Sequence, residues 1–138
     1  MRWLFLSAIL AAVTGCPSCA SEPPPACFTV DTSCAPLYLP TSFHEVYVQT
    51  IADSNGTCGS TKNSCHSASG DSGLSFATEQ GAFDGLTAKY VKPGDPSCSE
   101  LVVRTSSTGH DYTMPRGSSL SEPEQCALRK WVEMGAPR

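Results

Sequence analysis

The sequence predicts a small, mainly α-helical domain with long ordered loops, preceded by a signal peptide and a disordered tether. Three observations predict it: an apolar N-terminal run, a Pro- and Ser-rich stretch without helical or strand periodicity, and four later segments with helix signals. We place the signal peptide at residues 1–15, the Pro/Ser/Cys-rich tether at 16–40 and the domain at 41–138. A mature chain of about 120 residues is enough for one modest domain.

The N-terminus combines a basic residue with a short apolar run, MRWLFLSAILAAVTGC. Arg2 starts it, and the run is too short to span a bilayer, as is typical of a secretory signal peptide. Its end, VTGC, resembles the lipobox of bacterial lipoproteins, in which Cys16 becomes lipidated. We therefore expect an exported protein, periplasmic or at the outer membrane, anchored to the cell envelope by a lipid on Cys16. The alternative is ordinary cleavage near Ala20, which would discard Cys16.

Four segments of the domain carry helix signals: TSFHEVYVQTIA, DPSCSELVVRT, LSEPEQCALRKWVEMGAP and, more weakly, TEQGAFDGL. In the first and third, apolar residues recur on one helical face. Long, turn-rich loops separate the helices, which is unusual for a small domain unless something fills its interior. The start and stop signals are the capping boxes Ser42–Glu45 and Ser121–Glu124, the cap Asp95 followed by Pro96, and the stop residues Gly135 and Pro137.

Charge and cysteine content narrow the possible functions. The chain has 9 Lys and Arg against 13 Asp and Glu, and its net charge is −4. Without a basic cluster, nucleic acid is not expected as a partner. The 8 cysteines of an exported chain are expected to be disulfide-bonded, lipidated or ligated.

The stretch NGTCGSTKNSCHSASG, residues 55–70, places Cys58 upstream of the adjacent pair Cys65-His66. In a c-type haem site, two cysteines form thioethers with haem, and two residues normally lie between them. The histidine directly after the second cysteine ligates the iron. Here 6 residues, GSTKNS, separate the two cysteines. The motif alone is equally consistent with a haem site and with a Cys58–Cys65 disulfide beside a surface histidine.

A second candidate ligand is Met114, in the polar loop YTMPRGSS. Iron in electron-transfer cytochromes is commonly held by a histidine and a methionine. A methionine followed by proline in such a loop is a poor core residue and a plausible ligand. His110 is the next candidate for the distal position.

The same residues support two other kinds of metal site less well. Zinc would need a fourth ligand, His44 or His110, beside Cys58, Cys65 and His66. Blue copper would use two histidines, a cysteine and a methionine, but usually within a β-sandwich that the helical pattern argues against.

Taken in order, these pieces resemble the class I cytochrome c fold found as a domain of exported bacterial proteins. The resemblance covers roughly residues 43–137. It depends on a helix leading to Cys-x(n)-Cys-His, then VKPGDPSCSELVVR, then YTMPRGSSLSEPEQCALRKWVEMGAP. The resemblance implies one covalent haem c, with thioethers to Cys58 and Cys65, His66 as proximal ligand and Met114 as distal ligand.

Other cysteines are expected to pair with one another. Cys98 and Cys126 lie near the starts of two helices that the fold would pack together, which favours a disulfide between them. Within the tether, Cys27 and Cys34 are the expected pair, and Cys19 is left over.

The function implied is a monohaem c-type cytochrome that carries single electrons at the cell envelope and is not itself an enzyme. Its expected partners are envelope redox proteins and, through the lipid at Cys16, the membrane. The alternative is a structural or interaction module of a lipoprotein that keeps the fold, lacks haem and oxidises Cys58 and Cys65 to a disulfide.

Overall fold

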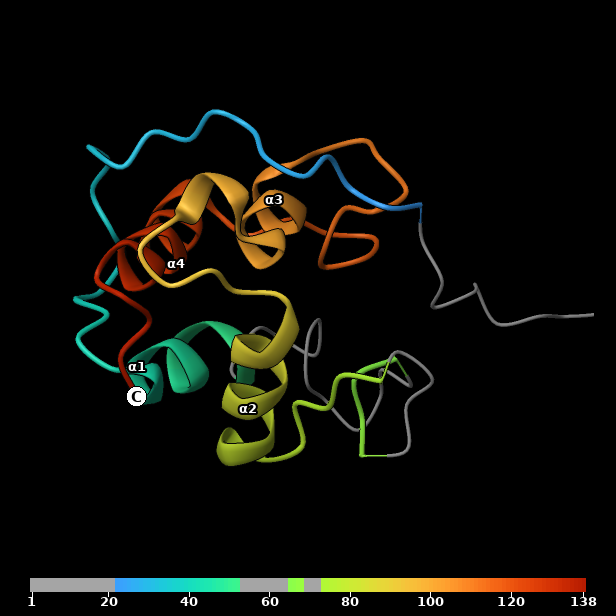
Figure 1. Ribbon diagram of the computed structural model, residues 1–138, viewed down its shortest axis with the longest axis vertical. Helices are drawn as coiled ribbons and strands as arrows, with labels where there is room; N and C mark the ends of the chain where they lie inside the picture. Colours follow the sequence, from blue (N-terminus) through green and yellow to red (C-terminus); the bar gives the residue numbers. More distant parts are fainter. Residues whose placement is uncertain (1–21, 53–64, 69–72) are drawn as a thin grey trace, which may run out of the picture.

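The computed structural model describes residues 22–52, 65–68 and 73–138, and all regular secondary structure in these residues is helical (Figure 1). The mainly α fold class is confirmed. None of the helices within these ranges is both long and apolar enough to cross a membrane. The helices are α1 (Phe43–Val46), α2 (Glu79–Lys89), α3 (Glu100–Ser106) and α4 (Glu122–Glu133), with a π-helical segment at Tyr47–Ala52 and a 3-10 turn at Pro96–Cys98.

The first and last helices begin with the capping boxes that the sequence predicts. The Glu45 carboxylate accepts a hydrogen bond from the backbone N–H of Ser42 at 2.8 Å, and Glu124 accepts one from Ser121 at 2.7 Å. Both bonds satisfy backbone donors that a helix start leaves without an intrahelical partner. The first helix then continues as the π-helical segment.

The end of α4 also follows its sequence signals. Gly135 has φ +94°, a conformation that glycine adopts without steric cost. Its N–H donates to the carbonyl of Val132, and that of Ala136 donates to the carbonyl of Trp131, both at 3.0 Å. These two bonds form a Schellman motif, which ends the helix.

The helix expected from Asp95 onward is interrupted at Ser99. The buried hydroxyl of Ser99 donates to the carbonyl of Asp95 at 2.8 Å and accepts from the backbone N–H of Lys92 at 2.8 Å. A serine that bonds the backbone in this way competes with helix continuation. A 3-10 turn therefore precedes the break and α3 follows it.

The helix weakly predicted in TEQGAFDGL extends beyond that segment, to Lys89. It is α2, and it begins at Thr78, whose side chain accepts a hydrogen bond from the N–H of Gly81 at 3.1 Å.

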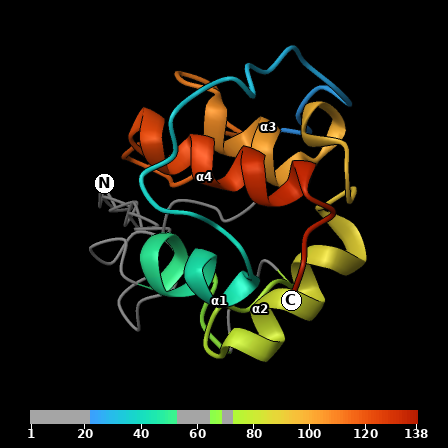
Figure 2. The same ribbon diagram turned by 90° about the vertical axis from the view of Figure 1, so that its left-hand side faces the viewer.

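The helices lie in two layers, with α3 and α4 in one and α1 and α2 in the other (Figures 1 and 2). Trp131 of α4 and Phe43 of α1 join the layers, with ring centroids 5.3 Å apart. Both side chains are buried, and burying such rings stabilises the fold by about 2–3 kcal/mol each. The C-terminus lies beside α2, where the Arg138 guanidinium is 5.3 Å from the ring centroid of Phe83.

Residues 22–40, here called the strap, run across the layer of α3 and α4 (Figures 1 and 2). Cys27 is disulfide-bonded to Cys98, and Cys34 to Cys126. The expected pairs Cys98–Cys126 and Cys27–Cys34 are therefore wrong, although the four predicted cysteines do form disulfides. Cys98 lies in the 3-10 turn before α3 and Cys126 lies in α4, and each is bonded to a cysteine of the strap.

The strap also corrects the expectation of a free tether over residues 22–40. The N–H of Phe28 donates to the carbonyl of Ser97, and that of Leu37 to the carbonyl of Pro123, both at 2.9 Å. Phe28 and Tyr38 pack against the core. An extended segment held at a few points has no periodic sequence pattern, so its composition reads as a linker.

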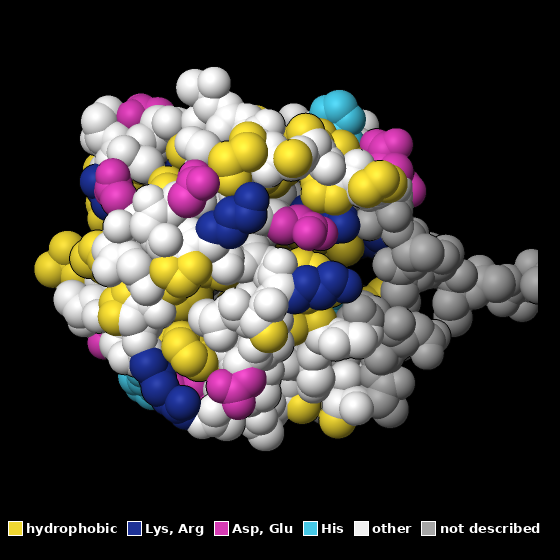
Figure 3. All heavy atoms as spheres, viewed as in Figure 1, with side chains coloured by type: hydrophobic (Ala, Val, Ile, Leu, Met, Phe, Trp, Pro, Cys, Tyr) yellow, Lys and Arg dark blue, Asp and Glu magenta, His cyan; other side chains and the backbone are white. Residues whose placement is uncertain are grey.

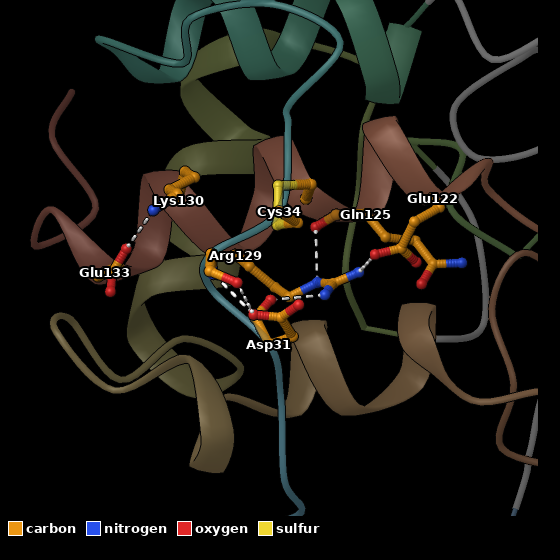
Figure 4. The surroundings of a disulfide bond; sticks show 9 residues. Asp31, Cys34, Glu122, Gln125, Arg129, Lys130 and Glu133 are labelled. Atoms are coloured by element: carbon orange, nitrogen blue, oxygen red, sulfur yellow. Dashed lines mark hydrogen bonds and ion pairs between the residues drawn. A yellow bond between two sulfur atoms is a disulfide. The ribbon is translucent and has the colours of Figure 1, made fainter.

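Arg129 of α4 also holds the strap through its side chain (Figure 4). Its side chain is 6% exposed. The guanidinium donates to the backbone carbonyl of Asp31 at 2.7 Å and to the Glu122 carboxylate at 2.5 Å, and Nε donates to the carbonyl of Gln125 at 3.3 Å. Each of the three guanidinium nitrogens thus has a hydrogen-bond partner, which offsets the cost of burying the charge.

Candidate functional site

The structure describes three of the four predicted haem-site residues. Cys65, His66 and Met114 are all half-buried. Cys58 lies outside the described residues, as do the predicted signal peptide, Cys16 and Cys19. The segment 65–68 and the loop that follows α3 lie on the same side of the molecule, at the right of Figure 1.

His66 is oriented by a backbone carbonyl. Its Nδ1 lies 3.0 Å from the carbonyl oxygen of Leu74. A carbonyl only accepts, so Nδ1 carries the proton and the lone pair of the neutral ring is on Nε2. Metal-ligating histidines are commonly fixed in this way, with one ring nitrogen bonded to the protein and the other facing the metal.

The protonation state of His66 also suits a ligand. Burial lowers the pKa of His66 below its ordinary value of 6.5, and the positive charge of Arg104 lowers it further, while the hydrogen bond to Leu74 partly opposes both. The ring is therefore neutral at pH 7. Only the neutral imidazole offers a lone pair to a metal.

The surroundings of His66 hold its ring in place. The ring stacks on that of Phe76, with centroids 4.6 Å apart and an interplanar angle of 29°. The backbone N–H of Phe76 donates to the carbonyl of His66 at 2.8 Å. Leu74, which supplies the carbonyl for Nδ1, packs against Gly85 of α2, where a glycine permits the close approach.

Met114 belongs to a loop with several internal contacts. Its N–H donates to the carbonyl of Arg104 at 2.9 Å, and the N–H of Thr113 donates to the carbonyl of His110 at 3.1 Å. An ion pair at 3.0 Å joins Asp111 to Arg116 across the methionine. The loop is thus shaped by its own hydrogen bonds.

A cavity of about 410 Å³ lies in this loop. Its lining comes from residues on both sides of Met114 and does not include Met114: Thr108, Gly109, His110, Asp111, Thr113, Pro115, Arg116, Gly117, Ser118 and Ser119.

Cys65 is disulfide-bonded. The other four described cysteines pair with one another, so its partner lies outside the described residues. A sulfur in a disulfide cannot also form a thioether. Attachment of haem at Cys65 would therefore require this bond to be reduced first.

The alternative histidine ligands have other contacts. His44 is 66% exposed and pairs with Glu79 at 2.9 Å. His110 stacks on Tyr112 with ring centroids 4.8 Å apart. Within the described ranges, no group of three His, Cys, Asp or Glu side chains is placed to hold a metal ion.

A family model described as Planctomycete cytochrome C matches residues 63–117. The match supports a cytochrome c-like domain. It includes Cys65, His66 and Met114, begins after Cys58 and ends before α4. No curated protein and no solved structure matches the chain.

Two residues contribute to the candidate site without having been predicted. Leu74 acts through its backbone carbonyl, for which a sequence carries no signal. Arg104 stands four residues after Glu100 and reads as one half of an ordinary helical ion pair. That spacing could have singled it out, but only the fold shows that it also reaches the loop of Met114.

Proposed function

We propose that the chain is a monohaem c-type cytochrome that carries single electrons at the cell envelope. In this proposal Cys58 and Cys65 hold haem c by thioethers, and His66 and Met114 ligate its iron. Bound haem would supply one-electron exchange between ferric and ferrous iron.

One observation carries the proposal: the 3.0 Å hydrogen bond from Nδ1 of His66 to the Leu74 carbonyl. It fixes the tautomer with its lone pair on Nε2, and a lowered pKa keeps the ring neutral. A surface histidine beside a disulfide would need neither feature.

The distal side supports the same conclusion. Met114 lies in a loop whose backbone is hydrogen-bonded to the end of α3. Ligation of haem iron by a methionine and a histidine would favour a comparatively high reduction potential. If His66 and Met114 both ligate the iron, a substrate could not reach it, so electron transfer and not catalysis is the expected role.

Charge suggests the kind of partner. The net charge is −4, and acidic and basic side chains are interspersed over the face drawn in Figure 3. A redox protein with a basic docking face, meeting this chain in a brief, small interface, fits that charge. A lipid on Cys16 would keep the encounter at the membrane.

A second function is favoured by one specific observation, the disulfide at Cys65. In this alternative the domain is a haem-free structural or interaction module, and oxidation of Cys65 is its final state.

Expression of the full chain with cytochrome-maturation machinery separates the two functions. Haem retained after denaturation, with the mass of the polypeptide plus one haem, supports the cytochrome. A colourless protein whose mass accounts only for disulfides supports the module.

Two methionine variants test the distal ligand. Met114→Ala should abolish the sulfur-to-iron absorption band and leave the haem attached. Met134→Ala is the matched control, because Met134 is 52% exposed at the end of α4, and its spectrum should be unchanged. If both variants keep the band, Met114 is excluded as a ligand.

A further inference from the structure

Arg104, in the last turn of α3, makes hydrogen bonds in three directions. Its Nε donates to the Glu100 carboxylate at 2.7 Å, and its guanidinium donates to the backbone carbonyl of Tyr112 at 3.1 Å. Its own carbonyl accepts from the N–H of Met114 at 2.9 Å. One residue thus holds the chain two residues before Met114 and at Met114 itself.

We propose that Arg104 is a positioning residue that fixes the loop of Met114 so that the sulfur stays at the distal position. This inference rests on the proposed function, since it assigns a role toward the iron ligand. It adds a residue whose side chain donates a hydrogen bond to the loop backbone, at the carbonyl of Tyr112.

The side chain of Arg104 is suited to this role by its chemistry. Its planar guanidinium bonds Glu100 and Tyr112 at the same time, which the single ammonium of a lysine does not reproduce. The ion pair with Glu100 orients the group along α3. The Arg104 side chain is only 18% exposed, so these bonds are little weakened by water.

The attachment points on the loop are themselves well placed. Tyr112 is 8% exposed, so its side chain is buried beside the carbonyl that Arg104 bonds. Between the two bonds lies only Thr113, which leaves the backbone at Met114 little freedom. A thioether is a weak, neutral metal ligand, and its ligation therefore depends strongly on being held in position.

The test compares three variants of the haem-loaded full chain. Arg104→Lys keeps the positive charge but loses the planar guanidinium, and Arg104→Gln loses both. Glu100→Gln is the matched control, because it removes the ion pair and leaves the bond to Tyr112. Haem content and helix content are measured for each, so that unfolded variants are recognised.

The apparent affinity for added imidazole reports how often the Met114 sulfur leaves the iron. Imidazole binds only those molecules in which the sulfur has left, so its apparent affinity rises with their fraction. We expect both Arg104 variants to bind imidazole about tenfold more tightly than wild type and to lose much of the sulfur-to-iron band. Glu100→Gln should change the affinity by less than about threefold. Unchanged imidazole affinity and an unchanged band in both Arg104 variants would overturn the proposal.

A second measurement does not depend on haem. In the haem-free protein, the Met114 amide should exchange with solvent at least about tenfold faster in both Arg104 variants than in wild type. If wild type holds no haem, the proposed function fails, and amide exchange alone decides whether Arg104 fixes the loop. Equal exchange rates would show that it does not.

Discussion

Gly85 and Leu74 lie so close together that a Cβ atom at position 85 would stand 2.6 Å from Cδ1 of Leu74. The carbonyl of the same leucine accepts the hydrogen bond from Nδ1 of His66. A glycine in the middle of α2 therefore permits the packing that places the histidine's partner.

Gly85→Ala should destabilise the domain and disturb His66. Alanine favours a helix by about 1 kcal/mol over glycine, but overpacking a buried leucine costs about 1–3 kcal/mol. We expect a net loss of about 1 kcal/mol in the free energy of unfolding, measured in urea. The Nδ1–H proton resonance of His66 should shift as the Leu74 carbonyl moves.

Gly81→Ala is the control within the same helix. Gly81 is exposed, and a Cβ there would meet only Oγ1 of Thr78, at 3.0 Å. Its stability should not fall, because the helix-propensity gain of about 1 kcal/mol is opposed only by this one contact, and the His66 resonance should be unmoved. Equal effects of the two variants would refute the role of the Gly85–Leu74 contact.

The disulfide pairing can be mapped on the non-reduced protein. Cleavage at Asp31, Lys89 and Arg104 places Cys27, Cys34, Cys98 and Cys126 on four separate fragments. Mass spectrometry should find one fragment pair joining Cys27 to Cys98 and another joining Cys34 to Cys126.

The stabilities of disulfide variants provide a second check. Replacing both Cys34 and Cys126 by serine opens a loop with a sequence separation of 92 and should lower the free energy of unfolding by about 2–5 kcal/mol. A variant lacking Cys34 and Cys98 should lose both bonds and be less stable still. A fragment joining Cys98 to Cys126 in the native protein would contradict the pairing.

Arg129→Met should loosen the strap while keeping much of the side-chain volume. It removes the donors to the carbonyls of Asp31 and Gln125, and the free energy of unfolding should fall by about 1–3 kcal/mol. The strap should be cut faster by a protease at Asp31. The matched control is Lys130→Gln, since the Lys130 pair with Glu133 is partly exposed, and it should stay within about 0.5 kcal/mol of wild type. An Arg129 variant as stable as wild type would show that the other attachments fix the strap without Arg129.

His44 gives the domain a pH dependence with a definite sign. The hydrogen bond to Glu79 raises the pKa of His44 above its ordinary value of 6.5. A raised pKa in the folded state stabilises the protein below about pH 6.5, and this contribution is lost as the pH rises through the folded pKa. His44→Gln should therefore lower the thermal midpoint at about pH 5 and match wild type at about pH 8.

Glu79→Gln separates this effect from that of His66. Burial lowers the pKa of His66, so its protonation opposes folding as the pH falls below about 6.5, with the opposite sign. Removing Glu79 leaves His66 unchanged and should reproduce the His44→Gln profile. A larger drop in the thermal midpoint of either variant at about pH 8 than at about pH 5 would contradict the raised pKa of His44.

The sequence by itself determined where most helices begin and end. Ser42, Ser121 and Gly135 act through hydrogen bonds and backbone angles within one turn of the chain, and such local signals do not depend on the fold. The same is true of the adjacent Cys65 and His66, whose spacing in the chain already limits what they can bind.

Only the tertiary structure decided the disulfide partners, the placement of the strap and the contacts of the Met114 loop. Cys27 meets Cys98 across a sequence separation of 71, and Arg129 meets Asp31 across 98. Contacts of this kind depend on which helix faces pack together, and local propensity carries no information about that packing. The carbonyl of Leu74 that orients His66 belongs to the same class, because every residue has a carbonyl and only the folded chain selects one.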